Sequence, residues 1–183
     1  MTDKREFVLN AKQLRKGKGE RVKGEVRHNE IYIVLDNVLD TYNIGSIFRL
    51  ADAVAAKKLY LCGGTEIPPN HRIKKASINT TEVVEWEYCE SALDVIRKLK
   101  IDNGQLKIIA VEQSKKSVPY DQFEYKLPIV LIVGNETTGV SKEVLKMADA
   151  IVEIPMFGVN KSLNVMVSLG IVLYKVISKT IRG

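Results

Sequence analysis

Short apolar runs alternate with stretches of helical periodicity along most of this chain. An uninterrupted apolar run is typical of a strand buried on both faces, whereas apolar residues at three- and four-residue steps are typical of a helix. These patterns predict strands over residues 31–36, 59–62, 83–88, 107–111, 129–133 and 151–154, and helices over residues 43–55, 91–99, 141–147 and 163–179. Strands that alternate with helices indicate an α/β fold, with a mostly parallel sheet flanked by helices.

Residues that cap helices stand at the starts of three predicted helices. Asn43, Ser141 and Ser162 each have a side-chain oxygen that can accept a hydrogen bond from a free backbone N–H. The helix after Ser162 carries apolar residues around nearly its whole circumference. Because such a helix must be buried on all sides, we expect a subunit interface there in addition to a core contact, and hence a dimer.

Positive charge is concentrated near the N-terminus. Residues 1–28 contain nine Lys or Arg and four Asp or Glu, so they carry 9 − 4 = +5 of the chain's net charge of +6. We interpret residues 1–28 as a basic arm, irregular or short-helical, and residues 29–183 as one globular domain. The arm fits a polyanionic partner, because phosphate contacts release counterions. A solvated tail that only aids solubility explains the charge equally well.

The composition argues against several classes of protein. No apolar run of about 18 residues is free of charge, so no membrane span is expected. Residues 1–9 are charged and lack an apolar core, so we expect no secretory signal. Cys62 and Cys89 lie far apart and match no metal-binding spacing. Since there is no cysteine framework, the expected location is the reducing cytoplasm.

Three polar segments follow predicted strands, at the edge where open α/β sheets bind ligands. The first, residues 37–49, leads into a helix that carries Ser46, Arg49 and Asp52 at three-residue steps. An arginine there suits phosphate, which guanidinium grips with two hydrogen bonds. An exposed Arg49–Asp52 pair would explain the same stripe, and such a pair contributes little to stability.

The second segment nearly matches a nucleotide phosphate loop. Gly134, Gly139 and Ser141 fit the pattern GxxxxGK[ST], but Val140 replaces the lysine and Glu136 places a carboxylate where phosphate would lie. We therefore reject a nucleoside triphosphatase, and the absence of GxGxxG after the first strand argues against a dinucleotide enzyme. The loop fits an uncharged or cationic ligand such as a sulfonium cofactor; a plain strand-to-helix turn is the alternative.

The third segment, residues 154–164, ends with Ser162 and Asn164 at the head of the last predicted helix. Free amide groups at a helix N-terminus can hold an anion or the polar edge of a cofactor. A capped helix with an incidental asparagine is the simpler interpretation of this segment taken alone.

Taken together, the three segments resemble the motifs of the SpoU/TrmH family of RNA ribose methyltransferases, in the SPOUT class. The matching stretches are NIGSIFRLADA (43–53), IVGNETTGVSKE (132–143) and IPMFGVNKSLNV (154–165), and the resemblance extends over about residues 29–178. Two positions depart from the common pattern: Leu50 stands where threonine is common, and Met166 where a small polar residue is common. These departures concern substrate details rather than activity.

The resemblance implies a C-terminal trefoil knot whose loops hold S-adenosylmethionine, and a homodimer whose site takes residues from both subunits. By position, the residues expected at the cofactor are Gly134, Ile154, Leu163 and Met156, with Val111 and Glu112 as weaker candidates. The expected catalytic residues are Asn43, Arg49, Glu136, Ser162 and Asn164. The resemblance makes Arg49 the key residue of the first motif. Because a guanidinium group stays protonated, we expect Arg49 to bind phosphate and stabilise an alkoxide rather than to act as a base.

The resemblance therefore predicts a cytoplasmic enzyme that methylates a ribose 2′-hydroxyl in structured RNA, with tRNA favoured over rRNA. A non-catalytic RNA-binding protein with a vestigial cofactor pocket is the alternative. The residues expected to dock the RNA backbone are Arg15, Lys16, Lys18 and Arg21 of the arm, together with Arg72, Lys74 and Lys75.

Overall fold

The computed structural model describes residues 8–18 and 26–181. Seven strands form one sheet in the order β3-β2-β1-β6-β4-β7-β5, and the pairs within it are parallel. The strands are β1 (Asn29–Asp36), β2 (Ala56–Cys62), β3 (Trp86–Cys89), β4 (Lys107–Val111), β5 (Val118–Pro119), β6 (Ile129–Gly134) and β7 (Ala150–Glu153). The α/β class and the mostly parallel sheet are therefore confirmed.

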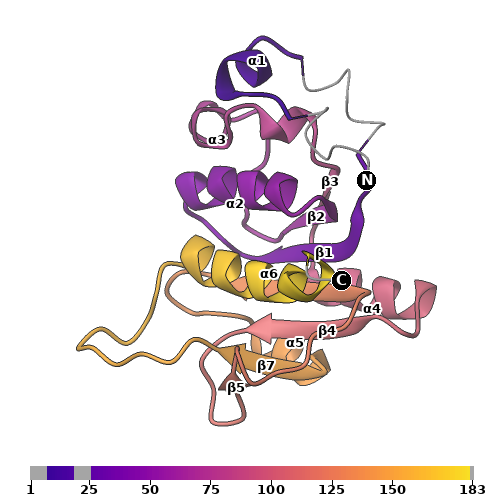
Figure 1. Cartoon of the computed structure of the whole chain (residues 1–183). Helices are drawn as coiled ribbons and strands as arrows, with labels where there is room; N and C mark the ends of the chain where they lie inside the picture. Colours follow the sequence, from indigo (N-terminus) through magenta and orange to yellow (C-terminus); the bar gives the residue numbers. More distant parts are fainter. Residues whose placement is uncertain (1–7, 19–25, 182–183) are drawn as a thin grey trace.

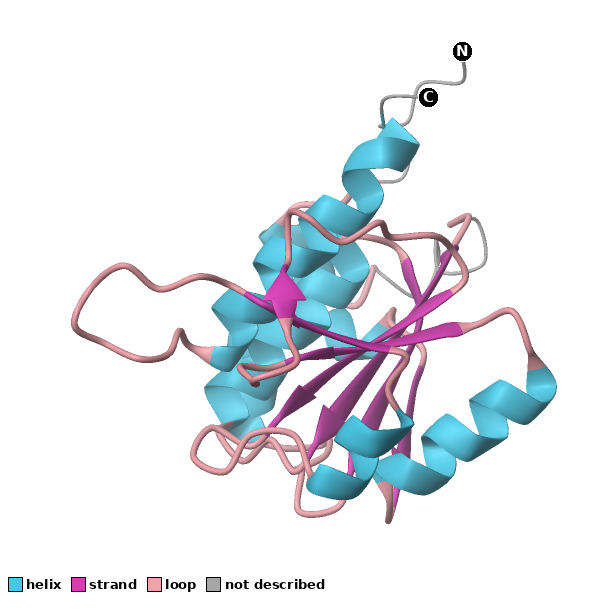
Figure 2. Cartoon of the chain, turned by 90° about the horizontal axis from the view of Figure 1, so that it is seen from below, coloured by secondary structure: helices cyan, strands magenta, loops and turns pink. Residues whose placement is uncertain are grey.

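Helices cover both faces of the sheet (Figures 1 and 2). One face carries α2 (Thr41–Ala53), α3 (His71–Ser77) and α6 (Val165–Ile181), and the other carries α4 (Ala92–Asp102) and α5 (Lys142–Met147). The short α1 (Ala11–Arg15) lies beside α3 (Figure 1), as does the 3₁₀ turn η3 (Thr80–Glu82).

Side chains of β1 enter two separate apolar clusters. Ile33 and Leu35 pack in the cluster under α2 and α6, whereas Val34 packs in the cluster under α4 and α5. All six residues of the neighbouring strand β6 are buried. These two central strands are therefore covered on both sides, as their uninterrupted apolar runs predict.

Two of the predicted helix caps are wrong by a few residues. The carboxylate of Asp40, not Asn43, caps α2 by accepting hydrogen bonds from the N–H groups of Tyr42 (2.8 Å) and Asn43 (3.0 Å). At α6 the side chain of Asn164, not Ser162, accepts from the N–H groups two and three residues further on (2.9 and 3.4 Å). Asn43 thus lies within the first turn of α2, and Asn164 is the residue that caps α6.

Other boundaries also differ from those predicted. The strand expected over residues 83–88 covers only Trp86–Cys89, because the N–H groups of Val83 and Val84 both turn back to the carbonyl of Thr80 (3.1 and 3.0 Å). Ser141 precedes α5 as expected, but its side chain makes no capping hydrogen bond. The sequence patterns also missed α3, η3 and β5, which are too short to show a clear period.

The last helix keeps one apolar side open to solvent. Leu169, Val172 and Leu173 of α6 are fully buried, whereas Val167 is 39% exposed and Tyr174 is 52% exposed. The single chain therefore does not cover the whole circumference of this helix. Among the described residues, no helix is long and apolar enough to cross a membrane.

Candidate functional site

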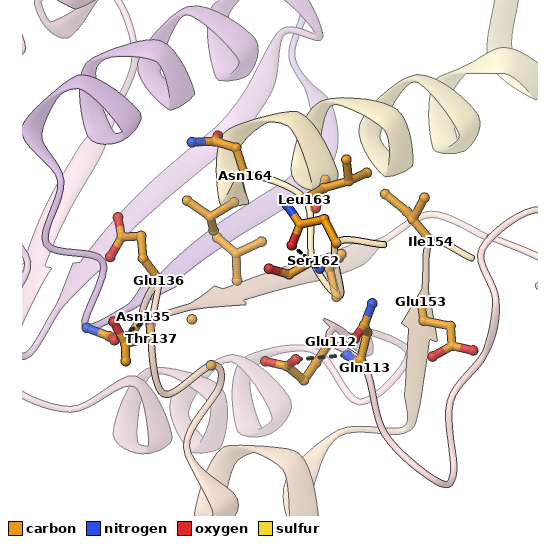
Figure 3. A pocket seen from close by; sticks show the side chains of 17 residues that line it. Glu112, Gln113, Asn135, Glu136, Thr137, Glu153, Ile154, Ser162, Leu163 and Asn164 are labelled. Atoms are coloured by element: carbon orange, nitrogen blue, oxygen red, sulfur yellow. Dashed lines mark hydrogen bonds between the residues drawn. The ribbon is translucent and has the colours of Figure 1, made fainter. Parts of the chain in front are cut away.

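The polar segments meet at the carboxyl edge of the sheet. The last residues of β1 and β6, Asp36 and Gly134, are partners in register, and β4 lies between β6 and β7. The ends of β6, β4 and β7, together with the chain leading into α6, enclose a pocket of about 440 Å³ (Figure 3). Five of the six residues predicted at the cofactor line this pocket: Val111, Glu112, Gly134, Ile154 and Leu163. The sixth, Met156, lines an adjoining hollow instead.

The wall of the pocket is part apolar and part polar, and its charged residues are acidic. Its apolar part comes from Val111, Val133, Ile154, Leu163 and Val165. Three carboxylates, those of Glu112, Glu136 and Glu153, also line it, and no Lys, Arg or His stands among its described lining residues. A flat apolar ring with a positively charged group attached would match both parts of this wall.

A tight hairpin follows β6 and forms one side of the pocket. The backbone groups of Asn135 and Gly139 exchange hydrogen bonds of 3.1 and 2.9 Å, and Gly139 adopts a φ of +71°. A Cβ atom at Gly134 would overlap the backbone of Gly139 and Val140. The carboxylate of Glu112 closes the hairpin from β4 by accepting from the N–H of Val140 (2.9 Å). Gly134 therefore allows backbone to pack closely on backbone, and Gly139 supplies the positive φ of the turn.

A chain of side-chain hydrogen bonds joins the three motifs. The amide of Asn164, at the head of α6, donates to the side-chain oxygen of Asn43 (2.9 Å), and the amide of Asn43 donates to a carboxylate oxygen of Glu136 (3.0 Å). The N–H groups of Leu39 and Asp40 also donate to Glu136, both at 3.1 Å. Asn164 and Glu136 line the pocket, while Asn43 is buried behind them. This relay, hereafter the Asn43 relay, fixes the relative positions of α2, α6 and the hairpin.

The charge of Glu136 is stabilised by the groups that contact it. Burial acts to raise its pKa, but the hydrogen bonds from Asn43 and from backbone N–H groups outweigh burial and lower the pKa below its usual value. Glu136 is therefore an ionised acceptor at neutral pH. Because the pKa is lowered on folding, these contacts stabilise the fold above the unfolded-state pKa, and that contribution is lost as the pH falls through the folded-state pKa.

Substitution of Asn43 by aspartate tests the Asn43 relay. The new carboxylate would face that of Glu136 in place of an amide donor, so we expect the free energy of unfolding to fall by about 1–3 kcal/mol at pH 7.5. Repulsion raises the pKa of one carboxyl in the folded state, so the loss should shrink as the pH falls towards 4.5. Urea unfolding at both pH values measures this. Asn103→Asp, which keeps its acceptor role toward the Gln105 N–H, is the control; equal losses in the two variants would refute the relay.

The other two predicted catalytic residues lie differently. Ser162 lines the pocket, and its N–H donates to the side chain of Asn160 at 3.4 Å. Arg49 lies on α2, six residues beyond Asn43. Its side chain is exposed, and it is not one of the residues that line the pocket. No hydrogen bond or ion pair joins the Arg49 side chain to another described residue. A single chain therefore assembles the predicted site without its arginine.

Most of the predicted RNA-contacting residues share one side of the molecule. The amide of Asn79, which follows α3, donates to the carbonyl of Leu14 in α1 at 3.4 Å and so ties the two helices together (Figure 1). Six exposed residues on or next to these helices form what we call the basic surface: Arg15, Lys16, Lys18, Arg72, Lys74 and Lys75. Arg21 lies outside the described residues.

The sequence patterns missed several residues that build the site. Asp36 is buried at the end of β1, where its carboxylate accepts from the N–H of Ser141 (2.8 Å) and the side chain of Asn37 (2.9 Å). Asn135 accepts from the N–H groups of Thr137 and Thr138 at 2.9 and 3.0 Å. A charged residue at the end of an otherwise apolar strand run is the signal that could have identified Asp36.

Comparison with known proteins supports a family assignment. The model of the SpoU rRNA Methylase family matches residues 30–174. The tRNA (guanosine(18)-2'-O)-methyltransferase of Aquifex aeolicus is 37% identical over 82% of this chain and 70% of its own length. The enzyme of the same name from Escherichia coli is 28% identical over 81% of this chain and 63% of its own length. The chain thus spans about two thirds of the length of these relatives.

Solved structures show the same fold. The Aquifex aeolicus TrmH/SpoU tRNA modifying enzyme aligns with a TM-score of 0.75 and 32% identity, over 94% of this chain and 83% of that one. The SpoU methyltransferase AviRb from Streptomyces viridochromogenes, solved in complex with the cofactor AdoMet (S-adenosylmethionine), aligns with a TM-score of 0.78 and 25% identity, over 86% of this chain and 63% of that one. The family model covers most of the chain, including all three motif segments, and the chain therefore belongs to the SpoU family of S-adenosylmethionine-dependent RNA methyltransferases.

Proposed function

We propose that this protein transfers a methyl group from S-adenosylmethionine to the 2′-hydroxyl of a ribose in structured RNA. The observation that carries the proposal is the Asn43 relay, which holds the three motif segments together at the wall of one pocket. The names of the tRNA 2'-O-methyltransferases from Aquifex aeolicus and Escherichia coli support the same activity.

The pocket residues fit the cofactor. Val111, Ile154 and Leu163 offer an apolar slot for an adenine ring. Because Gly134 has no side chain, the cofactor can approach the backbone closely at that position. The carboxylates of Glu112 and Glu153 suit a ligand with a net positive charge. When bound there, S-adenosylmethionine supplies an electrophilic methyl group. Much of the rate enhancement is then expected to come from holding the ribose hydroxyl in line with that methyl group. Ser162 and Asn164, which line the pocket, would position the hydroxyl.

Arg49 would complete the site of a second copy of the chain. Arg49 lies on α2, which packs against α6, and α6 leaves Val167 and Tyr174 exposed. A homodimer that covers this apolar side would bring α2 of one subunit to the pocket of its partner. Because a guanidinium stays protonated, Arg49 would bind an RNA phosphate and steady the negative charge that develops on the ribose oxygen as its proton leaves.

The basic surface on α1 and α3 would bind the RNA backbone, because its exposed lysines and arginines form no ion pair with other described residues. We take residues 1–28 as an RNA-binding arm and residues 29–183 as the catalytic domain.

Transfer RNA is the favoured substrate because the relatives described above are named for it, with ribosomal RNA next. The free thiols of Cys62 and Cys89 accord with the cytoplasmic location that we infer.

We also infer a trefoil knot near the C-terminus. Strand β7 follows β5 and β6 in the sequence but lies between β4 and β5 in the sheet. The chain that leaves β7 then makes a long loop before it enters α6 (Figure 1), and residues of this loop line the pocket. Connections that cross at one edge of a sheet are rare in proteins, and a knot near the C-terminus would account for this one.

The test is methyl transfer from labelled S-adenosylmethionine to tRNA and rRNA pools that lack ribose methylation. We expect label in tRNA, and resistance of the labelled linkage to alkaline cleavage would identify the 2′-oxygen. Calorimetry should show that the protein binds S-adenosylmethionine. If the protein binds RNA but neither binds the cofactor nor labels either pool, it is a non-catalytic RNA-binding protein with a vestigial pocket.

A further inference from the structure

The turn between β4 and β5 presents two adjacent lysines. The hydroxyl of Ser117 donates to the carbonyl of Ser114 (2.6 Å) and accepts from its N–H (3.2 Å), while the hydroxyl of Ser114 accepts from the N–H of Lys116 (3.2 Å). Lys115 and Lys116 are the middle residues of this turn, and both are exposed. No ion pair joins either lysine to another described residue. The serines thus hold two uncompensated positive charges in a defined turn.

A third lysine is tied to the same turn. The side-chain amide of Gln113 donates to the carbonyl of Lys161, at 2.7 Å, and so links the start of the turn to the loop between β7 and α6. Lys161 is exposed and likewise forms no ion pair within the described ranges. Gln113 lines the cofactor pocket (Figure 3). We call Lys115, Lys116 and Lys161 the lysine rim, because the residue that links them borders the pocket.

The lysine rim is suited to a ligand other than the cofactor. Lys115 and Lys116 do not line the pocket, and the pocket wall itself carries three carboxylates. An acidic pocket with a basic rim would attract a polyanion to the rim without drawing its phosphates into the pocket. Lysine is a mobile point charge that binds phosphate without a demand for one geometry, so three lysines on two loops fit an extended phosphate backbone.

The lysine rim also lies far from the basic surface. The basic surface is carried by α1 and α3 at one end of the molecule, whereas the turn leads into β5, the strand at the opposite edge of the sheet (Figure 1). The carboxyl ends of β6, β4 and β7, which enclose the pocket, lie between these two regions. The two groups of positive charge therefore lie on opposite sides of the strand ends that enclose the pocket.

We propose that the lysine rim binds the phosphate backbone of the substrate RNA beside the target ribose, opposite the basic surface. This inference rests on the proposed function for the identity of the RNA as substrate. With contacts on both sides, the RNA strand would cross the pocket mouth in one orientation. The rim would then contribute to the affinity for RNA and to its salt dependence, and not to the affinity for the cofactor.

The test replaces all three rim lysines by glutamine and measures binding of a fluorescein-labelled tRNA transcript by anisotropy over a range of salt concentrations. Loss of three phosphate contacts should reduce the slope of log K against log salt by about 2–3, and should raise Kd by on the order of tenfold at moderate salt. The affinity for S-adenosylmethionine, measured by calorimetry, should stay within about twofold.

The control is the triple variant Lys98→Gln, Lys107→Gln and Lys146→Gln. These three lysines are also exposed but lie on α4, at the start of β4 and on α5, and the control has the same net charge as the rim variant. An equal loss of RNA affinity in the two variants, or a rim variant that binds RNA with the wild-type salt slope, would overturn the proposal. If the wild type binds RNA through the lysine rim but transfers no methyl group, the proposal of RNA binding by the rim holds and the proposed function is wrong.

Discussion

Substitution of Arg49 by alanine is expected to lower the rate of methyl transfer by ~10²-fold or more, the size of effect seen when a group that stabilises a developing oxyanion is removed. Arg49 is exposed on α2 and contributes nothing to the core, so the variant should fold normally. Its affinity for S-adenosylmethionine should be unchanged, and its affinity for RNA should fall only severalfold, because one phosphate contact among many is lost. Single-turnover methyl transfer at saturating RNA separates the rate from binding.

Arg97→Ala is the matched control for this experiment. Arg97 is also an exposed helical arginine, but it lies on α4, on the other face of the sheet, and among the described residues it pairs only with Asp94, at 3.2 Å. An exposed pair of this kind contributes little, so the control should keep wild-type rates. Turnover by Arg49→Ala within about tenfold of wild type would exclude Arg49 from the chemical step.

The parts of the fold that could be predicted from sequence are those that the hydrophobic effect determines. The runs that become β1, β4 and β6 are buried on both faces, so their apolar character is uninterrupted and their positions were predicted within a residue or two. The 3₁₀ turn at Thr80–Glu82 and the two-residue strand β5 depend on a few backbone hydrogen bonds instead. Such short elements leave no periodic pattern, so sequence reasoning did not find them.

Sequence motifs likewise indicate which residues belong to the site, but not the tertiary contacts that join them. The motifs identified Asn43, Glu136 and Asn164, which do lie together, although nothing in their spacing shows that they form one hydrogen-bonded chain. Caps were misplaced because Asp40 and Asn164 compete with neighbours of similar capping preference, and tertiary contacts select between them. Asp36 was missed because its partner, the N–H of Ser141, lies 105 residues further along the chain.

Substitution of Gly134 by alanine is expected to weaken binding of S-adenosylmethionine by roughly tenfold to a hundredfold. The added Cβ would overlap the backbone of Gly139 and Val140, so the hairpin that forms one side of the pocket has to move. Overpacking of this kind costs about 1–3 kcal/mol of stability, which should lower the melting temperature without unfolding the protein. Calorimetry measures the cofactor affinity, and circular dichroism measures the melting temperature.

Gly104→Ala controls for the general effect of replacing a glycine, because a Cβ there would meet no atom within 4 Å. This control should bind the cofactor as the wild type does, and wild-type binding by Gly134→Ala would contradict the packing argument.

The Gly134→Ala variant also tests whether Arg49 serves the partner subunit. In mixed dimers of Gly134→Ala and Arg49→Ala chains, one pocket would be intact and faced by an intact Arg49 from the other chain. Such mixtures should regain methyl transfer that neither variant shows alone, whereas an Arg49 that serves its own pocket would leave them inactive.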